Sequence, residues 1–151
     1  MKFNLEEKLY NDYPELFYNV KNDLSKEITL MFGVECEDGW YPIIDIVCKE
    51  LLKQSRMERE KERTTEEYEE AMKTFSRIPK IVQIKEKFGT LRIYLNKETK
   101  EQQILLDLAE ALSSKVCEFC GVTKEVKLSS AGWRKTLCPE HMKIFYGTEN
   151  P

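Results

Sequence analysis

Four residues near the C-terminal end of the chain have the types and the spacing of a metal site. Cys117 and Cys120 form a Cys-x2-Cys pair, a turn that directs two thiolates at one point, and Gly121 permits the left-handed backbone that such a turn needs. Cys138 and His141 form a second pair, and seventeen residues separate it from Cys120. Three thiolates and one imidazole complete the closed tetrahedral set of a structural zinc site. We therefore predict a bound Zn²⁺ that stabilises this segment and keeps no open position for catalysis.

The groups that most enzymes use for catalysis are scarce in the rest of the chain. His141 is the only histidine, so zinc binding leaves no imidazole for a nucleophilic triad or a general base. Cys36 and Cys48 have no second histidine to activate them, and we interpret them as buried, small apolar groups. The chain also lacks a phosphate-binding glycine loop and a dinucleotide motif. These absences favour a protein that is not an enzyme.

One group of carboxylates remains as a catalytic candidate, because carboxylates at close spacing can bind magnesium. Its members are Glu35, Glu37, Asp38 and Asp45. The competing interpretation is solvation of a loop together with capping of the following helix by Asp38, and the local pattern favours it. A carboxylate–metal hydrolase is accordingly the third of three functional hypotheses.

A second candidate site combines basic and aromatic side chains in the middle of the chain. Segments 81–87 and 91–95 alternate apolar and polar residues and flank Phe88-Gly89-Thr90, a pattern that predicts a β-hairpin. On the first strand we expect Val82 and Ile84 to face the core. The side chains expected on the outward face are Gln83, Lys85, Lys87, Arg92 and Tyr94.

This outward face has the chemistry of an anion-binding surface. Residues 80–97 carry five basic side chains and one acidic side chain, within a chain of net charge −3. Arg92 can donate two parallel hydrogen bonds to a phosphate, and Tyr94 can stack on a base. We therefore expect a nucleotide or a nucleic acid as the ligand, with a merely solvated strand face as the alternative.

Helical periodicity accounts for much of the remaining chain. Apolar side chains at helical spacing predict that the helix over 98–115 covers the hairpin with one face, made of Ile104, Leu105, Leu108, Ala111 and Leu112. Almost every residue over 53–77 is charged, and opposite charges at helical spacing predict an exposed helical arm. Further helices are expected over 5–10, 14–18, 23–32, 40–51 and 139–146, and a small hairpin is expected from 122–127 and 133–137.

These elements predict an α+β fold. It comprises a helical N-terminal part, a central β-hairpin covered by helices, and a C-terminal module of the treble-clef or zinc-ribbon kind. We divide the chain into an α+β body over 1–115 and a zinc-binding module over 116–151 that packs on it. Because a two-stranded sheet is marginally stable alone, we expect helix cover, further strands or pairing between subunits in a homo-oligomer.

The composition is that of a globular protein with a heavily charged surface. The 151 residues are 41% hydrophobic and 34% charged. The sequence lacks an apolar run long enough to cross a membrane and the pattern of a signal peptide. We therefore expect a cytoplasmic protein, in which cysteines serve as thiols or metal ligands more often than as disulfides.

Three stretches form a specific combination. They are 38–44, which leads to 48–51; 83–92; and the Cys/His segment, with Gly132-Trp133 before Thr136-Leu137-Cys138. In this combination the chain resembles a family of small zinc-binding proteins that bacteriophages and prophages encode, over roughly Cys36 to His141. The resemblance implies a phage accessory protein in the cytoplasm of a bacterial host. It implies no activity and no ligand, so it assigns no site residues.

The first functional hypothesis is an accessory protein that binds an anionic ligand and counters host defence by sequestering a nucleotide signal. The second is an adaptor or inhibitor that binds a host protein through the arm over 53–77 and a set of aromatic side chains, which are frequent interface anchors. These aromatics are Phe119, Trp133, Phe145 and Tyr146. Packing of the same aromatics around the zinc module is the alternative to the second hypothesis.

Overall fold

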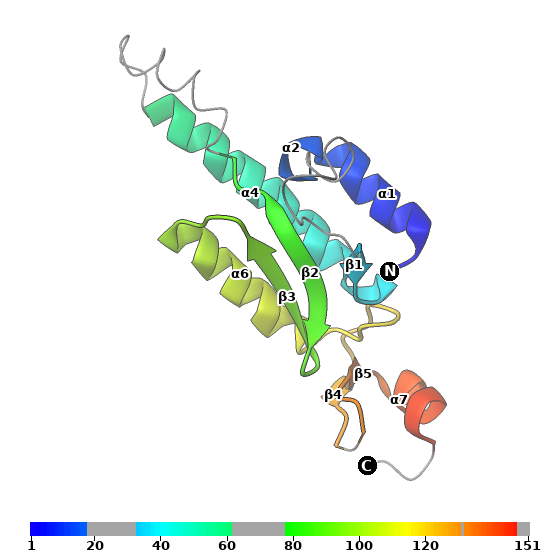
Figure 1. Ribbon diagram of the computed structural model, residues 1–151. Helices are drawn as coiled ribbons and strands as arrows, with labels where there is room; N and C mark the ends of the chain where they lie inside the picture. The colour runs from blue at the N-terminus through cyan, green and yellow to red at the C-terminus, as the bar shows by residue number, and fades with distance from the viewer. Residues whose placement is uncertain (18–32, 62–77, 131, 148–151) are drawn as a thin grey trace.

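The computed structural model describes residues 1–17, 33–61, 78–130 and 132–147, and these form the expected α+β fold (Figure 1). The expected helix over 23–32 and the part of the charged arm over 62–77 lie outside the described residues. The first part of the arm continues the helix that begins at Tyr41 and ends at Lys61. Within the described part of the chain, no helix is both long enough and apolar enough to cross a bilayer.

A three-stranded sheet forms the centre of the fold. Strands β2 (Ile81–Lys87) and β3 (Thr90–Leu95) are antiparallel, which confirms the central hairpin. Strand β1 (Val34–Glu35) adds to the sheet in parallel with β2, giving the order β1-β2-β3. Phe88 and Gly89 join β2 to β3 with φ values of 55° and 83°, the positive values of a type I′ turn.

The pairing of β2 differs from the prediction at one point. A register shift lies between Ile81 and Gln83, as in a β-bulge. Inward- and outward-facing side chains therefore alternate regularly only after this shift. Ile81 and Ile84 are both fully buried, whereas Val82 is half-buried. The prediction for Ile84 is therefore confirmed and that for Val82 is wrong, because the extra residue turns Ile81 into the core in its place.

Helices cover the sheet and supply most of the core. Helix α4 (Tyr41–Lys61) follows the short 3-10 helix η1 (Asp38–Trp40) and extends well beyond the predicted helix over 40–51. Helices α1 (Phe3–Asp12) and α2 (Pro14–Phe17) complete the N-terminal part. The main core joins these helices to the sheet; its fully buried members include Leu9, Leu16, Trp40, Ile44, Leu51, Ile81 and Ile84.

Helix α6 (Lys100–Ser113) lies beside β3 and also contacts α4 (Figure 1). Thr99 caps it with a complete capping box, in which Thr99 and Gln102 satisfy each other's backbone N–H groups. The buried face of the helix consists of Gln102, Leu106, Ala109 and Ser113.

The predicted buried face of α6 is wrong. Ile104, Leu108 and Leu112 are 68%, 55% and 48% exposed, and Ala111 is exposed as well; of the predicted set, only Leu105 packs against the core. Polar anchoring explains the difference, because the Ser113 hydroxyl oxygen accepts a hydrogen bond from the Leu91 N–H at 2.9 Å. That bond satisfies a backbone donor of β3 and fixes which side of α6 faces the sheet.

The C-terminal elements form a second, smaller core. Strands β4 (Lys127–Leu128) and β5 (Thr136–Leu137) make an antiparallel pair, and helix α7 (Pro139–Tyr146) follows. The predicted small hairpin and final helix are thus both present, with shorter strands than expected. The second core has three buried members, Cys117, Leu137 and Cys138.

Candidate metal centre

The structure brings Cys117, Cys120, Cys138 and His141 together at one point. Their ligand atoms all lie within 4.8 Å of one another, and no other such group of metal-binding side chains occurs in the described ranges. The Sγ atoms of Cys120 and Cys138 are 3.8 Å apart, and Nδ1 of His141 lies 3.7 Å from Sγ of Cys117 and 3.2 Å from Sγ of Cys138. The cluster could therefore bind a metal ion.

Two backbone turns hold these ligands. In the first, the Gly121 N–H donates to the Cys117 carbonyl at 2.9 Å, and the Cys117 N–H donates to the Val122 carbonyl at 2.8 Å. Gly121 has φ of 77°, the left-handed value that the sequence predicted for this turn. In the second, Cys138 precedes the first turn of α7, which carries His141 on to the same point.

The two turns also favour the ionised form of one thiol. Burial raises the pKa of Cys117, but backbone N–H groups lower it by more, so that it lies below its ordinary value. These N–H groups belong to Phe119, Cys120 and Cys138. Burial, together with its neighbouring thiols, raises the pKa of Cys120 to about 11. A cation that binds here displaces protons, so its affinity falls as the pH is lowered.

Aromatic and charged side chains gather around Phe119, which lies between Cys117 and Cys120 in the sequence. The Phe119 ring stacks on His141 at 5.4 Å between centroids and contacts Phe145 at 4.4 Å. Glu118 is 1% exposed and forms an ion pair with Lys135 at 3.0 Å. Burial raises the pKa of Glu118, and Lys135 opposes the rise. The Lys135 ammonium group also lies 5.4 Å from the centre of the Phe119 ring.

The metal centre is attached to the body by direct backbone contact. The Gly39 N–H in η1 donates to the Glu118 carbonyl at 2.7 Å, and Nε1 of Trp40 donates to the Val116 carbonyl at 2.9 Å. A Cβ atom at Gly39 would lie 2.2 Å from the Cys117 carbonyl oxygen. The close approach of Gly39 to the Cys-x2-Cys turn depends on long-range contacts, which local sequence does not reveal.

The tip of the β2–β3 hairpin makes a second attachment to the C-terminal module. The Glu86 carboxylate accepts hydrogen bonds from the Gly89 N–H at 2.6 Å and from Nε1 of Trp133 at 3.1 Å. The Thr136 hydroxyl donates to the Gly89 carbonyl at 2.5 Å. The hairpin and the C-terminal module are thus joined by one side chain of the hairpin, Glu86, and by two of the module, Trp133 and Thr136.

The five side chains of the predicted ligand face come from the hairpin as expected. Gln83 is opposite Tyr94 and Lys85 is opposite Arg92, so these four form two adjacent cross-strand pairs. The Lys85 ammonium lies 5.4 Å from the centre of the Tyr94 ring. Lys87 is exposed beside the turn, 5.6 Å from the centre of the Phe88 ring.

Carboxylates accompany this basic face, which the sequence pattern did not indicate. Arg92 forms an ion pair with Glu110 of α6, and Nε2 of Gln83 donates to Glu35 of β1 at 3.1 Å. The acidic partners come from elements distant in the sequence. Any anion that binds Arg92 must therefore compete with Glu110.

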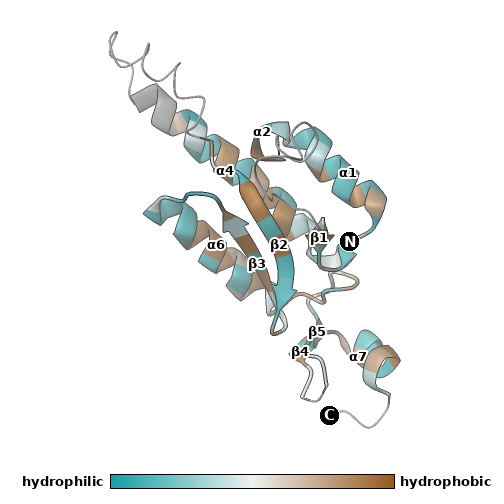
Figure 2. Cartoon of the chain, in the orientation of Figure 1, coloured by the Kyte–Doolittle hydropathy of each residue, from teal (hydrophilic) through white to brown (hydrophobic). Residues whose placement is uncertain are grey.

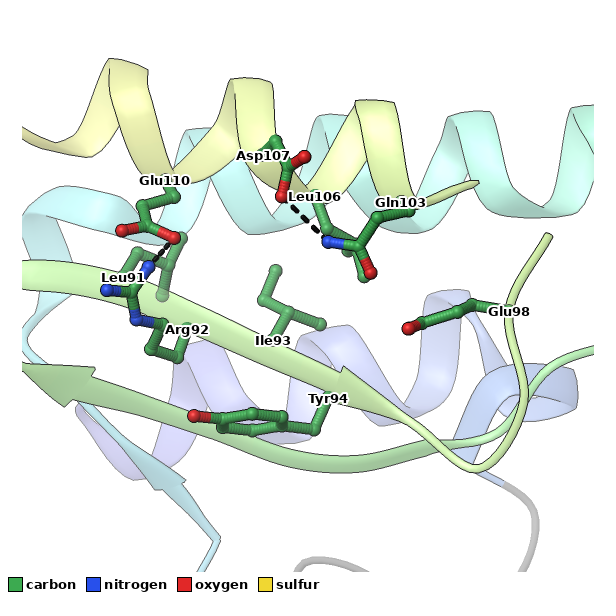
Figure 3. A pocket seen from close by; sticks show the side chains of 9 residues that line it. All are labelled: Leu91, Arg92, Ile93, Tyr94, Glu98, Gln103, Leu106, Asp107 and Glu110. Atoms are coloured by element: carbon green, nitrogen blue, oxygen red, sulfur yellow. Dashed lines mark hydrogen bonds and ion pairs between the residues drawn. The ribbon is translucent and has the colours of Figure 1, made fainter. Parts of the chain in front are cut away.

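Arg92 and Tyr94 also line a groove of about 280 Å³ between β3 and α6 (Figure 3). On the α6 side, Asp107 accepts a hydrogen bond from Nε2 of Gln103 at 2.7 Å. The groove has apolar lining from Ile93 and other side chains of the two elements, and three carboxylates, which are Glu98, Asp107 and Glu110. Sequence reasoning identified the β3 side of this groove and missed the α6 side.

The acidic residues proposed as a magnesium site do not form one group that could hold a metal ion. Asp38 accepts a hydrogen bond from the Lys2 N–H at 2.7 Å and forms an ion pair with its ammonium group at 3.0 Å. Asp45 accepts a hydrogen bond from the Tyr13 hydroxyl at 2.7 Å. These two carboxylates and Glu35 thus have separate partners.

Cys36 and Cys48 are both buried, as we expected from the absence of an activating histidine. Burial raises the pKa of each thiol, that of Cys36 to about 12. The proposed interface aromatics divide into two kinds: Phe119 packs on His141, whereas Trp133 is 75% exposed.

Comparison of the chain with protein-family models, with curated proteins and with solved structures found no match.

Proposed function

We propose that this is a zinc-stabilised, non-enzymatic protein that binds a nucleotide in the groove between β3 and α6. Zinc is the metal that the four ligands suit best, since ligands at about 2.0–2.3 Å from a tetrahedral zinc ion lie about 3.3–3.8 Å from one another. Three of the separations between ligand atoms, at 3.2, 3.7 and 3.8 Å, are close to this range, and all of the separations are within 4.8 Å. The order of turn, hairpin, second turn and helix is that of a treble-clef module, which we include in the proposal.

One observation carries the ligand assignment: Arg92 and Tyr94 meet the hydrogen-bonding side chains of Gln103 and Asp107 across one groove. A cation for phosphate, an aromatic ring for stacking and polar groups for a base edge are the components of a nucleotide site. The volume of about 280 Å³ is slightly below the range of roughly 300–1,000 Å³ for small-ligand sites. It suits a single nucleotide better than a polymer.

The charges indicate the orientation of the ligand. The groove holds more carboxylates than cations, so phosphates belong outside it, on the strand face where Lys85 stands opposite Arg92. The base would enter the groove beside Tyr94 and present its edge to Asp107. A carboxylate accepts two adjacent hydrogen bonds, which matches the neighbouring N–H donors of guanine. Guanine nucleotides should therefore bind more tightly than the other nucleotides.

The biological role follows from binding without turnover. A protein that binds a nucleotide without converting it lowers the free concentration of that nucleotide. For a phage accessory protein in a bacterial cytoplasm, sequestering a nucleotide signal of host defence would be such a role. Support for this setting comes from the resemblance in the sequence alone.

Isothermal titration with a panel of mono- and dinucleotides tests the proposal. Arg92→Gln should abolish binding. Glu110→Gln should strengthen it about tenfold, because it removes the carboxylate that competes with phosphate. Lys49→Ala, which removes an exposed lysine from α4, is the matched control and should leave affinity unchanged. If the wild-type protein binds no nucleotide, or if Glu110→Gln weakens binding, the ligand assignment is wrong.

The exposed Trp133 favours a second candidate, the adaptor or inhibitor of a host protein. Its indole N–H is held by Glu86 while the ring is 75% exposed, so an aromatic anchor is presented in a fixed position. Pull-down from a bacterial lysate with wild-type and Trp133→Ala proteins distinguishes this candidate. A host protein retained only by wild type supports it, and identical recovery by both proteins refutes it.

A further inference from the structure

Helix α6 presents an apolar face that no described element covers. We call this face the α6 stripe; it consists of Ile104, Leu108, Ala111 and Leu112. Hydrophobic residues recur along α6 in Figure 2. Ile104, Leu108 and Leu112 follow one another at intervals of four residues, so they lie in a row along one side of the helix. The row is separate from the groove, which is lined by other side chains of α6.

A stripe of this kind calls for a partner, because soluble monomers rarely expose contiguous apolar patches without a function. The opposite side of α6 already packs on the body through Leu106 and Ala109. Most of the large aliphatic side chains of α6 therefore face outward, which is unusual for a surface helix of a monomer. Exposed aliphatic side chains in a row are the pattern of a helix that packs on another helix.

Two oppositely charged residues at the ends of the α6 stripe indicate what kind of surface it pairs with. Glu101 lies in the first turn of α6, and Lys115 lies just beyond its last residue; both are exposed. The positions 101, 104, 108, 112 and 115 are three, four, four and three residues apart, so they form one contact seam along a side of the helix, and this seam is symmetric about 108. The seam thus begins with an acid, continues with apolar residues and ends with a base.

This seam is complementary to itself in one direction only. In an antiparallel pair centred on Leu108, Ile104 would lie opposite Leu112 of the other copy and Glu101 opposite its Lys115. A parallel pair would place Glu101 opposite Glu101 and Lys115 opposite Lys115, which is unfavourable. We propose that two copies of this chain associate through an antiparallel pair of α6 helices, with a two-fold axis at Leu108.

The association should be weak and reversible. One helix of 14 residues offers much less surface than the roughly 1,200–2,000 Å² that specific, stable interfaces bury. Dimer formation should therefore depend on protein concentration, and it requires neither the metal nor a nucleotide.

Sedimentation velocity of the full-length protein over a concentration series tests the inference. Wild type should shift from monomer to dimer as concentration rises. Leu108→Glu should remain monomeric at every concentration. Ile144→Glu, at an apolar position of α7 with 67% exposure, is the matched control and should dimerise as wild type does. Circular dichroism confirms that both variants are folded.

A charge exchange tests the direction of pairing. Glu101→Lys and Lys115→Glu should each weaken the dimer about fivefold to thirtyfold, because each places two like-charged pairs in the symmetric interface. The double variant should recover most of the wild-type affinity. A wild-type protein that stays monomeric, a dimer that survives Leu108→Glu, or a double variant no tighter than the single ones would each overturn the inference.

Discussion

Replacing Gly39 with alanine tests how the metal centre is attached to the body. The new Cβ atom would lie 2.2 Å from the Cys117 carbonyl oxygen, 2.5 Å from the Gly121 nitrogen and 2.6 Å from the Glu118 carbonyl oxygen. These distances are about 1 Å short of ordinary van der Waals contact. All three atoms belong to backbone, so no side chain can rotate away. The 3-10 helix and the Cys-x2-Cys turn must therefore separate.

The magnitude follows from the hydrogen bonds that separation would break. They are the bond from the Gly39 N–H to Glu118 at 2.7 Å and the bond from the Trp40 indole to Val116 at 2.9 Å. A buried polar group left without its partner costs about 1–3 kcal/mol, so losing both bonds costs about 2–6 kcal/mol. That is a large part of the roughly 5–15 kcal/mol that stabilises a typical domain.

Urea unfolding followed by tryptophan fluorescence measures this loss, because Trp40 is fully buried. Gly147→Ala is the control, since its Cβ atom would meet no other atom within 4 Å and only its φ of 78° is unfavourable to alanine. With ψ of −173°, this residue has a backbone conformation that almost only glycine adopts, and the strain for alanine costs about 1–3 kcal/mol. If Gly39→Ala is destabilised by less than this control and retains its metal, the close backbone contact does not exist.

Three further predictions concern the metal, a buried charge and a helix cap. Chelation should make the three cysteine ligands reactive towards a thiol reagent while Cys36 and Cys48, both buried and with raised pKa values, stay protected; reaction of all five at one rate would contradict this. Lys135→Met should destabilise the fold by about 3–5 kcal/mol in thermal unfolding, since it leaves Glu118 buried without its cation. This substitution raises the pKa of Glu118 further, so the folded state binds the Glu118 proton more tightly than the unfolded chain does. The loss of stability should therefore grow as the pH rises above 4.5, the ordinary pKa of a glutamate. Adding Glu118→Gln should remove this pH dependence. Thr99→Ala should cost about 1 kcal/mol by the same measurement, because it removes one half of the capping box of α6.

Local spacing was enough to predict that the three cysteines and His141 form one cluster. Cys117 and Cys120 must lie close together because a short turn joins them, and the same holds for Cys138 and His141 at the start of α7. The β2–β3 hairpin was predictable for a similar reason, since its two-residue turn fixes the pairing of its strands. In these cases the sequence neighbours are also the structural neighbours.

Predictions failed where contacts between distant segments decide the outcome. The periodicity of α6 identified a helix with an apolar face, but the bond between Ser113 and Leu91 orients a different face towards the sheet. Likewise, no local pattern pairs Arg92 with Glu110. A hydrophobic pattern indicates that a helix has an apolar face, but it does not show whether the same chain or a partner buries that face.

The tip of the β2–β3 hairpin connects the metal centre to the proposed ligand face. Gly89 is bonded on one side to Glu86 and on the other to Thr136, which lies two residues before the ligand Cys138. The position of Thr136 is set by the short strand β5, and a strand of two residues cannot maintain itself without further support. A metal ion bound at the cluster would supply that support by fixing Cys138. Metal binding would therefore stabilise the turn between β2 and β3, and with it the strand register that places Lys85 opposite Arg92, although neither side chain belongs to the Cys/His cluster.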